Sequence, residues 1–122
     1  MKSYTSIEQS IILSKILSNE GADMCWQYQK DRWVGEPDYK DFPQFEYAID
    51  KRDIPCWSLA ALLTYLSKIK PRVYTPILFP SKGKWILQFA EYGHGNVCEV
   101  SCDNLIDACY EMILKLHEEN LL

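Results

Sequence analysis

The fold class is decided by residues 74–102, YTPILFPSKGKWILQFAEYGHGNVCEVSC. Runs rich in β-branched and aromatic residues alternate here with short turn sequences, which is the pattern of antiparallel strands. Three strands are predicted, at 74–79, 84–92 and 97–102. The turn at 80–83 has the length and residue types of a hairpin loop, and the turn at 93–96 holds two glycines suited to positive φ. The segment therefore predicts a three-stranded meander.

Helical patterns and one further strand flank this meander. Apolar residues spaced by three and four predict helices over 5–18, 56–67 and 103–119. Thr5 and Glu8 have the form of a capping box, Pro55 or Ser58 can begin the second helix, and Asp103 suits the N-cap of the third. A strand over 22–30 is predicted because Met24, Trp26 and Tyr28 alternate with more polar residues.

Together these elements predict an α+β fold in one domain over residues 1–122. We expect an antiparallel sheet of three to five strands with about three helices packed against it, in a single pair of layers. The residues expected beneath the helices are Trp26, Trp85, Leu87 and Phe89, or the residues that alternate with them along the strands. The length of 122 residues fits one domain, and the hydrophobic fraction of 48% argues against disorder.

The net charge and the number of cysteines indicate which cellular compartment and which classes of partner to expect. The net charge of −4 disfavours nucleic-acid binding through a global positive field. No apolar leader and no long apolar run is visible, so we expect neither secretion nor a membrane partner. The odd count of five cysteines predicts free thiols in a reducing, cytoplasmic compartment.

The cysteines and histidines allow two interpretations, a zinc site or buried thiols. The candidate ligands are Cys98, Cys102 and Cys109 with His94 or His117. Structural zinc sites usually pair their ligands at tight spacing, and that spacing is missing here. Free cysteine packs like a small hydrophobic residue, so buried thiols are the favoured interpretation and neither a metal nor another cofactor is predicted.

Thiol catalysis is the alternative function. Cys56 would occupy the first turn of the second predicted helix, where the helix N-terminus lowers a thiol pKa. A small thiol-dependent enzyme would use Cys56 or Cys98 with His94 as the base. No motif joins these residues, and we predict no catalytic residue. Phosphate-binding glycine motifs and a distinctive pair of carboxylates are also absent from the sequence.

Basic residues gather on either side of residues 73–81. These are Lys68, Lys70, Arg72, Lys82 and Lys84. On one face they would form a modest basic patch for nucleic acid. The favoured interpretation is a solvated rim that guards strand edges, which makes nucleic acid a disfavoured partner.

The segment 33–53 is the main candidate for function because it is acidic and aromatic without a regular period. Its candidate interaction residues are Trp33, Tyr39, Phe42, Phe45 and Tyr47. Aromatic anchors on a loop are typical of protein interfaces, whereas the alternative is that they cover one face of the sheet. The leading hypothesis is a non-catalytic interaction or accessory module that binds another protein, with self-association left open.

Several stretches resemble a group of small uncharacterised proteins from Bacteroides-type gut bacteria, their phages and mobile elements. The matching stretches are Ser6-Ile7-Glu8-Gln9-Ser10, Ala22-Asp23-Met24-Cys25-Trp26, Trp57-Ser58-Leu59, Ala61-Leu62-Leu63 and 103–110 with the end of the last helix. The resemblance covers about half of the chain and implies a cytoplasmic, phage-linked accessory protein of unknown function. It implies no catalytic or binding residue.

Overall fold

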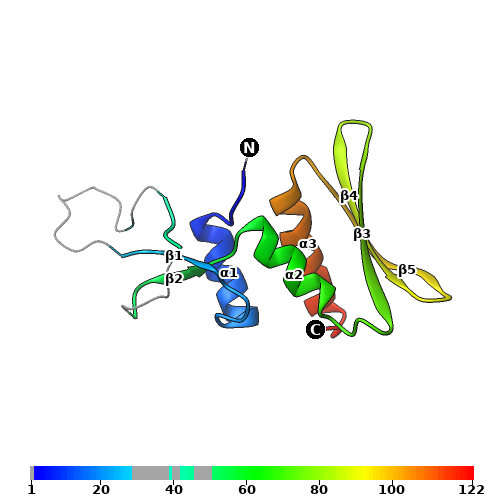
Figure 1. Cartoon of the computed structure of the whole chain (residues 1–122), viewed down its shortest axis with the longest axis horizontal. Helices are drawn as coiled ribbons and strands as arrows, with labels where there is room; N and C mark the ends of the chain where they lie inside the picture. The colour runs from blue at the N-terminus through cyan, green and yellow to red at the C-terminus, as the bar shows by residue number, and fades with distance from the viewer. Residues whose placement is uncertain (1, 29–38, 40–41, 46–50) are drawn as a thin grey trace.

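The computed structural model describes residues 2–28, 39, 42–45 and 51–122 (Figure 1). Its elements are α1 (Ile7–Leu17), β1 (Met24–Trp26), β2 (Ile54–Cys56), α2 (Leu59–Ser67), β3 (Tyr74–Ser81), β4 (Lys84–Glu91), β5 (Gly95–Cys102) and α3 (Leu105–Glu118). Over the described residues there are three helices and two antiparallel sheets, which confirms the predicted α+β class. The strands divide into a pair, β1–β2, and a meander, β3–β4–β5.

The predicted meander is present with each strand beside the next along the chain. Leu87 in β4 lies opposite Leu78 in β3 and Val100 in β5. Side chains alternate between the faces of a strand, so these three residues share one face, which packs against α3. Leu87 and Phe89 are fully buried there as predicted, whereas Trp85 is only half-buried near the start of β4.

The prediction of a strand over 22–30 is wrong in length, because the strand among the described residues is shorter. The ladder of β1 holds three residues, all buried, and pairs Met24 with Cys56 in β2. The expected alternation fails because Cys25 is paired on the other edge with Gln44 while Met24 and Trp26 join a separate apolar cluster. Trp26 therefore packs in the small sheet and not beneath the meander.

Two of the predicted helix starts are displaced by one residue. In α1 the N-cap is Ser6, with Gln9 completing the capping box, because the Thr5 side chain is buried in other hydrogen bonds. In α3 the N-cap is Asn104 in place of Asp103, whose side chain pairs with Lys84 instead. The alternative start of the second helix at Ser58 is confirmed, since its hydroxyl accepts from the backbone of Ala61.

The main core lies between the helices and the meander (Figure 1). Helix α3 is its centre because it contacts β4, β5, α2 and α1. The buried face of α3 includes Cys109, Met112, Ile113 and Leu116, as its spacing predicted. Trp57, which follows β2 directly, is fully buried in the same core. No helix among the described residues is long and apolar enough to cross a bilayer.

Candidate functional site

The five predicted interaction residues have different positions. Trp33 and Tyr47 lie outside the described residues. Tyr39 is half-buried against the β1–β2 cluster, and its hydroxyl donates to the Arg52 carbonyl at 2.9 Å. Its ring also meets Tyr28 edge-on, with centroids 5.8 Å apart. Tyr39 therefore acts as a cover for the small sheet, which is the alternative that the sequence left open.

Phe42 and Phe45, in contrast, lie on the surface. Their rings are 68% and 78% exposed, the highest values among the large apolar side chains of the described residues. The chain between them is firmly attached, because Gln44 exchanges two backbone hydrogen bonds of 2.8 Å with Cys25. Pro43 is buried beside this attachment. The fold thus fixes a short segment while leaving its two phenylalanines exposed.

A mostly apolar hollow of about 750 Å³ lies beside these rings, and we name it the aromatic hollow. It is lined by Ser3, Tyr4, Asp23, Met24, Phe42, Pro43, Phe45, Ser58, Leu59, Ala60 and Leu63. Helix α2 supplies the wall formed by Leu59, Ala60 and Leu63, and β1 supplies Met24. The aromatic hollow therefore unites the exposed phenylalanines with the first turns of a helix far away in sequence.

The polar edge of the aromatic hollow is formed by Asp23 and Ser58. The Asp23 carboxylate accepts from the Ser58 backbone at 2.9 Å and also from the Ser58 hydroxyl. The same hydroxyl oxygen accepts from Ala61 in the first turn of α2. A carboxylate at a helix N-terminus is favourable to the helix dipole. No lysine or arginine lines the aromatic hollow among the described residues, so its one formal charge is negative.

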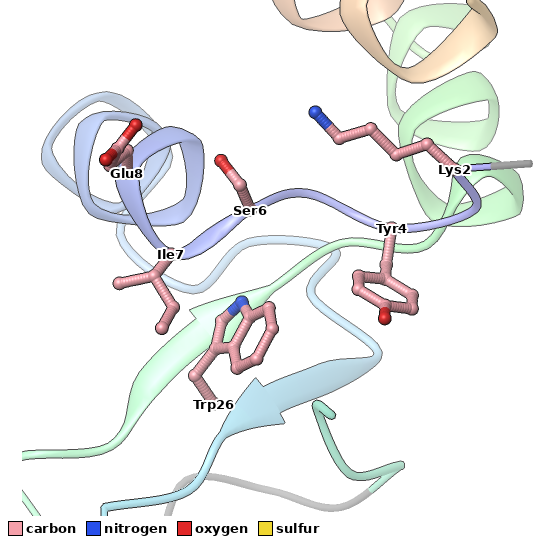
Figure 2. Close-up of a pocket in the computed structure, with 6 residues that line it drawn as sticks. All are labelled: Lys2, Tyr4, Ser6, Ile7, Glu8 and Trp26. Carbon is pink, nitrogen blue, oxygen red and sulfur yellow. The ribbon is translucent and has the colours of Figure 1, made fainter. Parts of the chain in front are cut away.

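A smaller hollow of about 320 Å³ lies on the other side of Tyr4 (Figure 2). Figure 2 shows the rings of Tyr4 and Trp26 and the side chain of Ile7 on one side of the N-terminal segment, with Lys2 and Ser6 directed to the other. The two rings meet edge-on at 5.8 Å, and the Trp26 indole N–H donates to the Thr5 carbonyl at 3.2 Å. Tyr4 lines both hollows.

A polar hollow of about 590 Å³ lies between the starts of α1 and α3 and the end of β5. Asp107 dominates it, accepting from the Lys2 amine at 2.9 Å, the Gln9 amide at 2.8 Å and the Asn104 amide at 2.7 Å. Burial disfavours the charged carboxylate, but these hydrogen bonds outweigh that cost and lower the pKa of Asp107. The arrangement ties the N-terminal segment to α3, which is a structural role.

Asp107→Asn should lower the free energy of unfolding at pH 7 by about 1 kcal/mol, a value discounted for the partial exposure of the ion pair. Because folding lowers this pKa, the contribution is present above the ordinary carboxyl pKa and is lost as the pH falls through the folded value. Urea unfolding from pH 7 to pH 2 should therefore show the two proteins converging at low pH. A constant difference at every pH would contradict the charge-based account. Asp103→Asn, which removes a more exposed ion pair with Lys84, is the matched control.

The thiols proposed for catalysis are enclosed. Cys56 lies in β2, two residues before the N-cap Ser58, so the predicted position in the first helical turn is wrong. It is fully buried, with its sulfur 3.4 Å from the Thr5 hydroxyl. Burial raises the pKa of the Cys56 thiol, and the hydrogen bonds to Thr5 only partly offset this. This setting disfavours the thiolate form that a nucleophilic cysteine uses.

The second thiol–histidine combination is not assembled either. Burial in β5 raises the pKa of the Cys98 thiol, and the negative charge of Glu119 adds to this. His94 is exposed in the turn between β4 and β5. Among the described residues no hydrogen bond joins His94 to a sulfur. In the part of the chain that the structure describes, His94 is therefore not placed as a base for either thiol.

The candidate zinc ligands do not converge on one point. Within the described ranges no three side chains of His, Cys, Asp or Glu are placed to hold a metal ion. All five cysteines are thiols and not disulfides. Burial raises the pKa of Cys109 to about 12, which shows how apolar the surroundings of this candidate ligand are.

Thiol labelling should follow this burial. With an aromatic disulfide reagent at pH 7.5, the half-buried Cys102 should be the one thiol to react in the native protein, and slowly, because burial and nearby Glu111 raise its pKa. Cys102→Ser should abolish the native reaction, and denaturant should expose the remaining thiols. Rapid native labelling of Cys56 or Cys98 would contradict their placement.

The basic residues of the sequence form two groups and not one patch. Lys82 and Lys84 lie at the turn between β3 and β4, whereas Lys70 and Arg72 precede the opposite end of β3. All four are exposed, and Lys84 forms an ion pair of 3.0 Å with Asp103. Since β3 is eight residues long, about 25 Å separates the two groups.

Part of the aromatic hollow was visible in the sequence and part was not. The predicted residues Phe42 and Phe45 line it, but Tyr4, Asp23 and Ser58 were not predicted to belong to a site. The one available signal was Ser58 as a helix N-cap, which placed it on the surface without indicating a neighbour. Comparison with known proteins adds no relative, because no protein-family model, curated protein or solved structure matches the chain.

Proposed function

We propose that this chain is a non-catalytic protein-interaction module that binds a segment of another protein in the aromatic hollow. The observation that carries the proposal is the exposure of Phe42 and Phe45 beside an apolar hollow, on a segment that Gln44 attaches to β1. Exposed aromatic rings around an apolar depression are typical of interface anchors. No catalytic role accounts for them, because they carry no titratable or nucleophilic group.

Energetics support an intermolecular role for the two rings. Covering most of an exposed phenylalanine side chain releases about 25 cal/mol per Å², or about 2 kcal/mol for each ring. The folded chain does not obtain this contribution by itself, since both rings remain in water. A bound segment would obtain it from both, and the backbone pairing of Gln44 with Cys25 reduces the entropy lost on fixing residues 42–45.

The lining of the aromatic hollow favours a segment with one or two bulky apolar side chains. Its walls are mainly apolar, and its charged group, Asp23, favours a lysine or arginine next to those side chains. We place the module in a reducing, cytoplasmic compartment because all five cysteines are thiols. An accessory role linked to a phage or mobile element belongs to the same proposal and rests on the sequence resemblance alone.

The test compares wild-type protein with the double variant Phe42→Ser/Phe45→Ser in affinity capture, followed by rebinding of each purified captured protein. We expect at least one partner whose affinity falls tenfold or more in the double variant. Ile12→Ser, which changes an exposed apolar residue on α1, is the matched control and should bind like the wild type. If every captured partner binds the double variant equally well, the proposed site is wrong.

Stability measurements separate interface residues from covering residues. Phe42→Ser and Phe45→Ser should each change the free energy of unfolding by less than about 0.5 kcal/mol, because both rings are exposed. Tyr39→Ala should lower it by about 2 kcal/mol, because its ring packs on Tyr28 and its hydroxyl is hydrogen-bonded. Unfolding of the domain by the phenylalanine substitutions would place the rings in the core and remove the proposed interface.

A further inference from the structure

The outer face of the meander, opposite α3, carries a second apolar surface. Leu78 and Leu87 face the core, so their neighbours Ile77, Phe79 and Ile86 face away from it. Phe79 lies opposite Ile86, and Tyr92 extends the pairing by donating to the Val73 carbonyl at 2.9 Å. We call this surface the outer strip, formed by Val73, Ile77, Phe79, Ile86 and Tyr92. Four of its five side chains are between 37% and 59% exposed.

The size of the outer strip matches a single helix. It lies mainly on β3 and β4, because the outward positions of β5 include the polar residues Asn96, Glu99 and Ser101, and Val97 at the bulge is the large exposed apolar residue of that strand. Two strands are about 10 Å wide and eight residues are about 25 Å long, close to the dimensions of a helix of 16 residues. On the other face of the same sheet, the 14-residue α3 contacts two strands, β4 and β5, while α2 contacts β3.

The sheet edges disfavour an added strand. On the β3 edge, Pro76 and Pro80 have no N–H to donate to a new neighbour. On the β5 edge, the Lys115 amine already donates to the Glu99 carbonyl at 2.8 Å. A partner is therefore expected to lie on the face of the sheet rather than to extend it.

The charges around the outer strip indicate which helix fits. The basic groups at its ends are Lys70 and Arg72 on one side and Lys82 and Lys84 on the other. The acidic side chain on the outer face of β5, Glu99, accepts from the Gln88 amide at 2.7 Å. We propose that the outer strip binds an amphipathic helix of another protein, about 16 residues long, with acidic residues in its first and last turns. This surface is separate from the aromatic hollow.

The proposal is tested with two synthetic 16-residue helices that share one leucine-rich face. One has glutamates in both terminal turns and the other has lysines at the same positions. Titrated into the ¹⁵N-labelled full chain, the glutamate helix should bind at least tenfold more tightly and shift the amides of β3 and β4. Equal affinities, no binding of the glutamate helix, or shifts confined to other elements would overturn the proposal.

Variants separate the apolar from the charged contribution. Ile77→Thr/Phe79→Thr keeps strand-favouring residues and should weaken binding of the glutamate helix at least tenfold. Arg72→Glu/Lys82→Glu should reverse the preference between the two helices. Phe45→Ser, which alters the aromatic hollow, should leave the affinity for the glutamate helix unchanged, so failure of that site is distinguishable from failure of this one.

Binding of either of two other occupants to the outer strip would overturn the proposal, and each is tested directly. The first is an anionic membrane surface. The outer strip would be assigned to it if the chain co-sediments with vesicles of phosphatidylglycerol and phosphatidylcholine, if Ile77→Thr/Phe79→Thr abolishes this co-sedimentation, and if neither helix binds. The second is another copy of this chain. The outer strip would be assigned to it if sedimentation equilibrium of the chain alone detects a dimer and the same variant dissociates that dimer. We expect no vesicle binding and a monomer.

Discussion

Trp57→Ala is expected to lower the free energy of unfolding by about 4 kcal/mol. Trp57 is fully buried, and its indole N–H donates to the Glu20 carbonyl at 2.9 Å. Truncation to alanine removes the largest fully buried side chain among the described residues and leaves that carbonyl without its donor. The loss combines the transfer energy of the ring with a cavity that rigid neighbours fill only partly.

Urea unfolding followed by far-UV circular dichroism measures this effect. Trp57→Phe keeps an aromatic ring and loses the hydrogen bond, so its cost should be about half as large. Phe79→Ala, on the outer face of the meander, should cost less than about 1 kcal/mol because that ring is partly exposed already. A Trp57→Ala protein as stable as the Phe79→Ala protein would show that the cavity account is wrong.

The position of Trp57 also makes this residue a test of the predicted single domain. It follows β2 directly and is buried in the core formed by α1, α2, α3 and the meander. If residues 1–122 form one domain, probes in the small sheet and in the meander should lose their signal at the same urea concentration in the wild type. Two separate transitions would contradict the single-domain prediction.

The sequence predicted the meander and the helices well because their signals are local. The strands of residues 74–102 alternate with a period of two, and each turn lies within a few residues of the strands that it joins. The buried face of α3, at Cys109, Met112, Ile113 and Leu116, follows a helical spacing that needs no distant partner. The N-caps of α1 and α3 moved by one residue, because neighbouring polar side chains can exchange that role, and α2 begins after Ser58 and not at residue 56.

The small sheet was not predicted because it depends on a distant pairing. Met24 meets Cys56 across more than thirty residues, and the sequence around Cys56 reads as the start of a helix. Pro55 fitted a first helical turn, yet a proline is also tolerated in a short strand at the edge of a sheet. Which of the two applies is decided by the partner strand and not by the local sequence.

The candidate site was likewise predicted only in part, because some of its residues come together only through distant contacts. Phe42 and Phe45 stood out as large apolar residues in an irregular acidic segment. Their neighbours Tyr4 and Ser58 did not, because a short bridge between those two residues brings the N-terminal segment to the start of α2. The amino-acid sequence indicates aromatic residues that can anchor an interface, whereas the aromatic hollow beside them forms only when the chain folds.

Thr5→Val is expected to lower the free energy of unfolding by about 3 kcal/mol although the two side chains have nearly the same shape. The Thr5 hydroxyl is fully buried, lies 2.8 Å from the Ser10 hydroxyl and accepts from the Trp57 backbone N–H at 3.1 Å. Valine leaves that N–H and the buried Ser10 hydroxyl without this partner, and each unsatisfied buried group costs about 1–3 kcal/mol. Thermal and urea unfolding should agree on the loss.

Two further variants distinguish lost hydrogen bonds from altered packing. Thr5→Ser keeps the oxygen and removes one methyl group, so its cost should stay near 1 kcal/mol. In a Ser10→Ala background, Thr5→Val should cost less than in the wild type, because one of the two orphaned groups is already gone. A cost of Thr5→Val no larger than that of Thr5→Ser would contradict the account based on the hydroxyl, and a smaller cost would show that the methyl group contributes more than the hydroxyl to holding the start of α1 against β2. The sequence pattern of a capping box assigned Thr5 to the end of a helix, yet its hydroxyl is used to join two segments that are fifty residues apart.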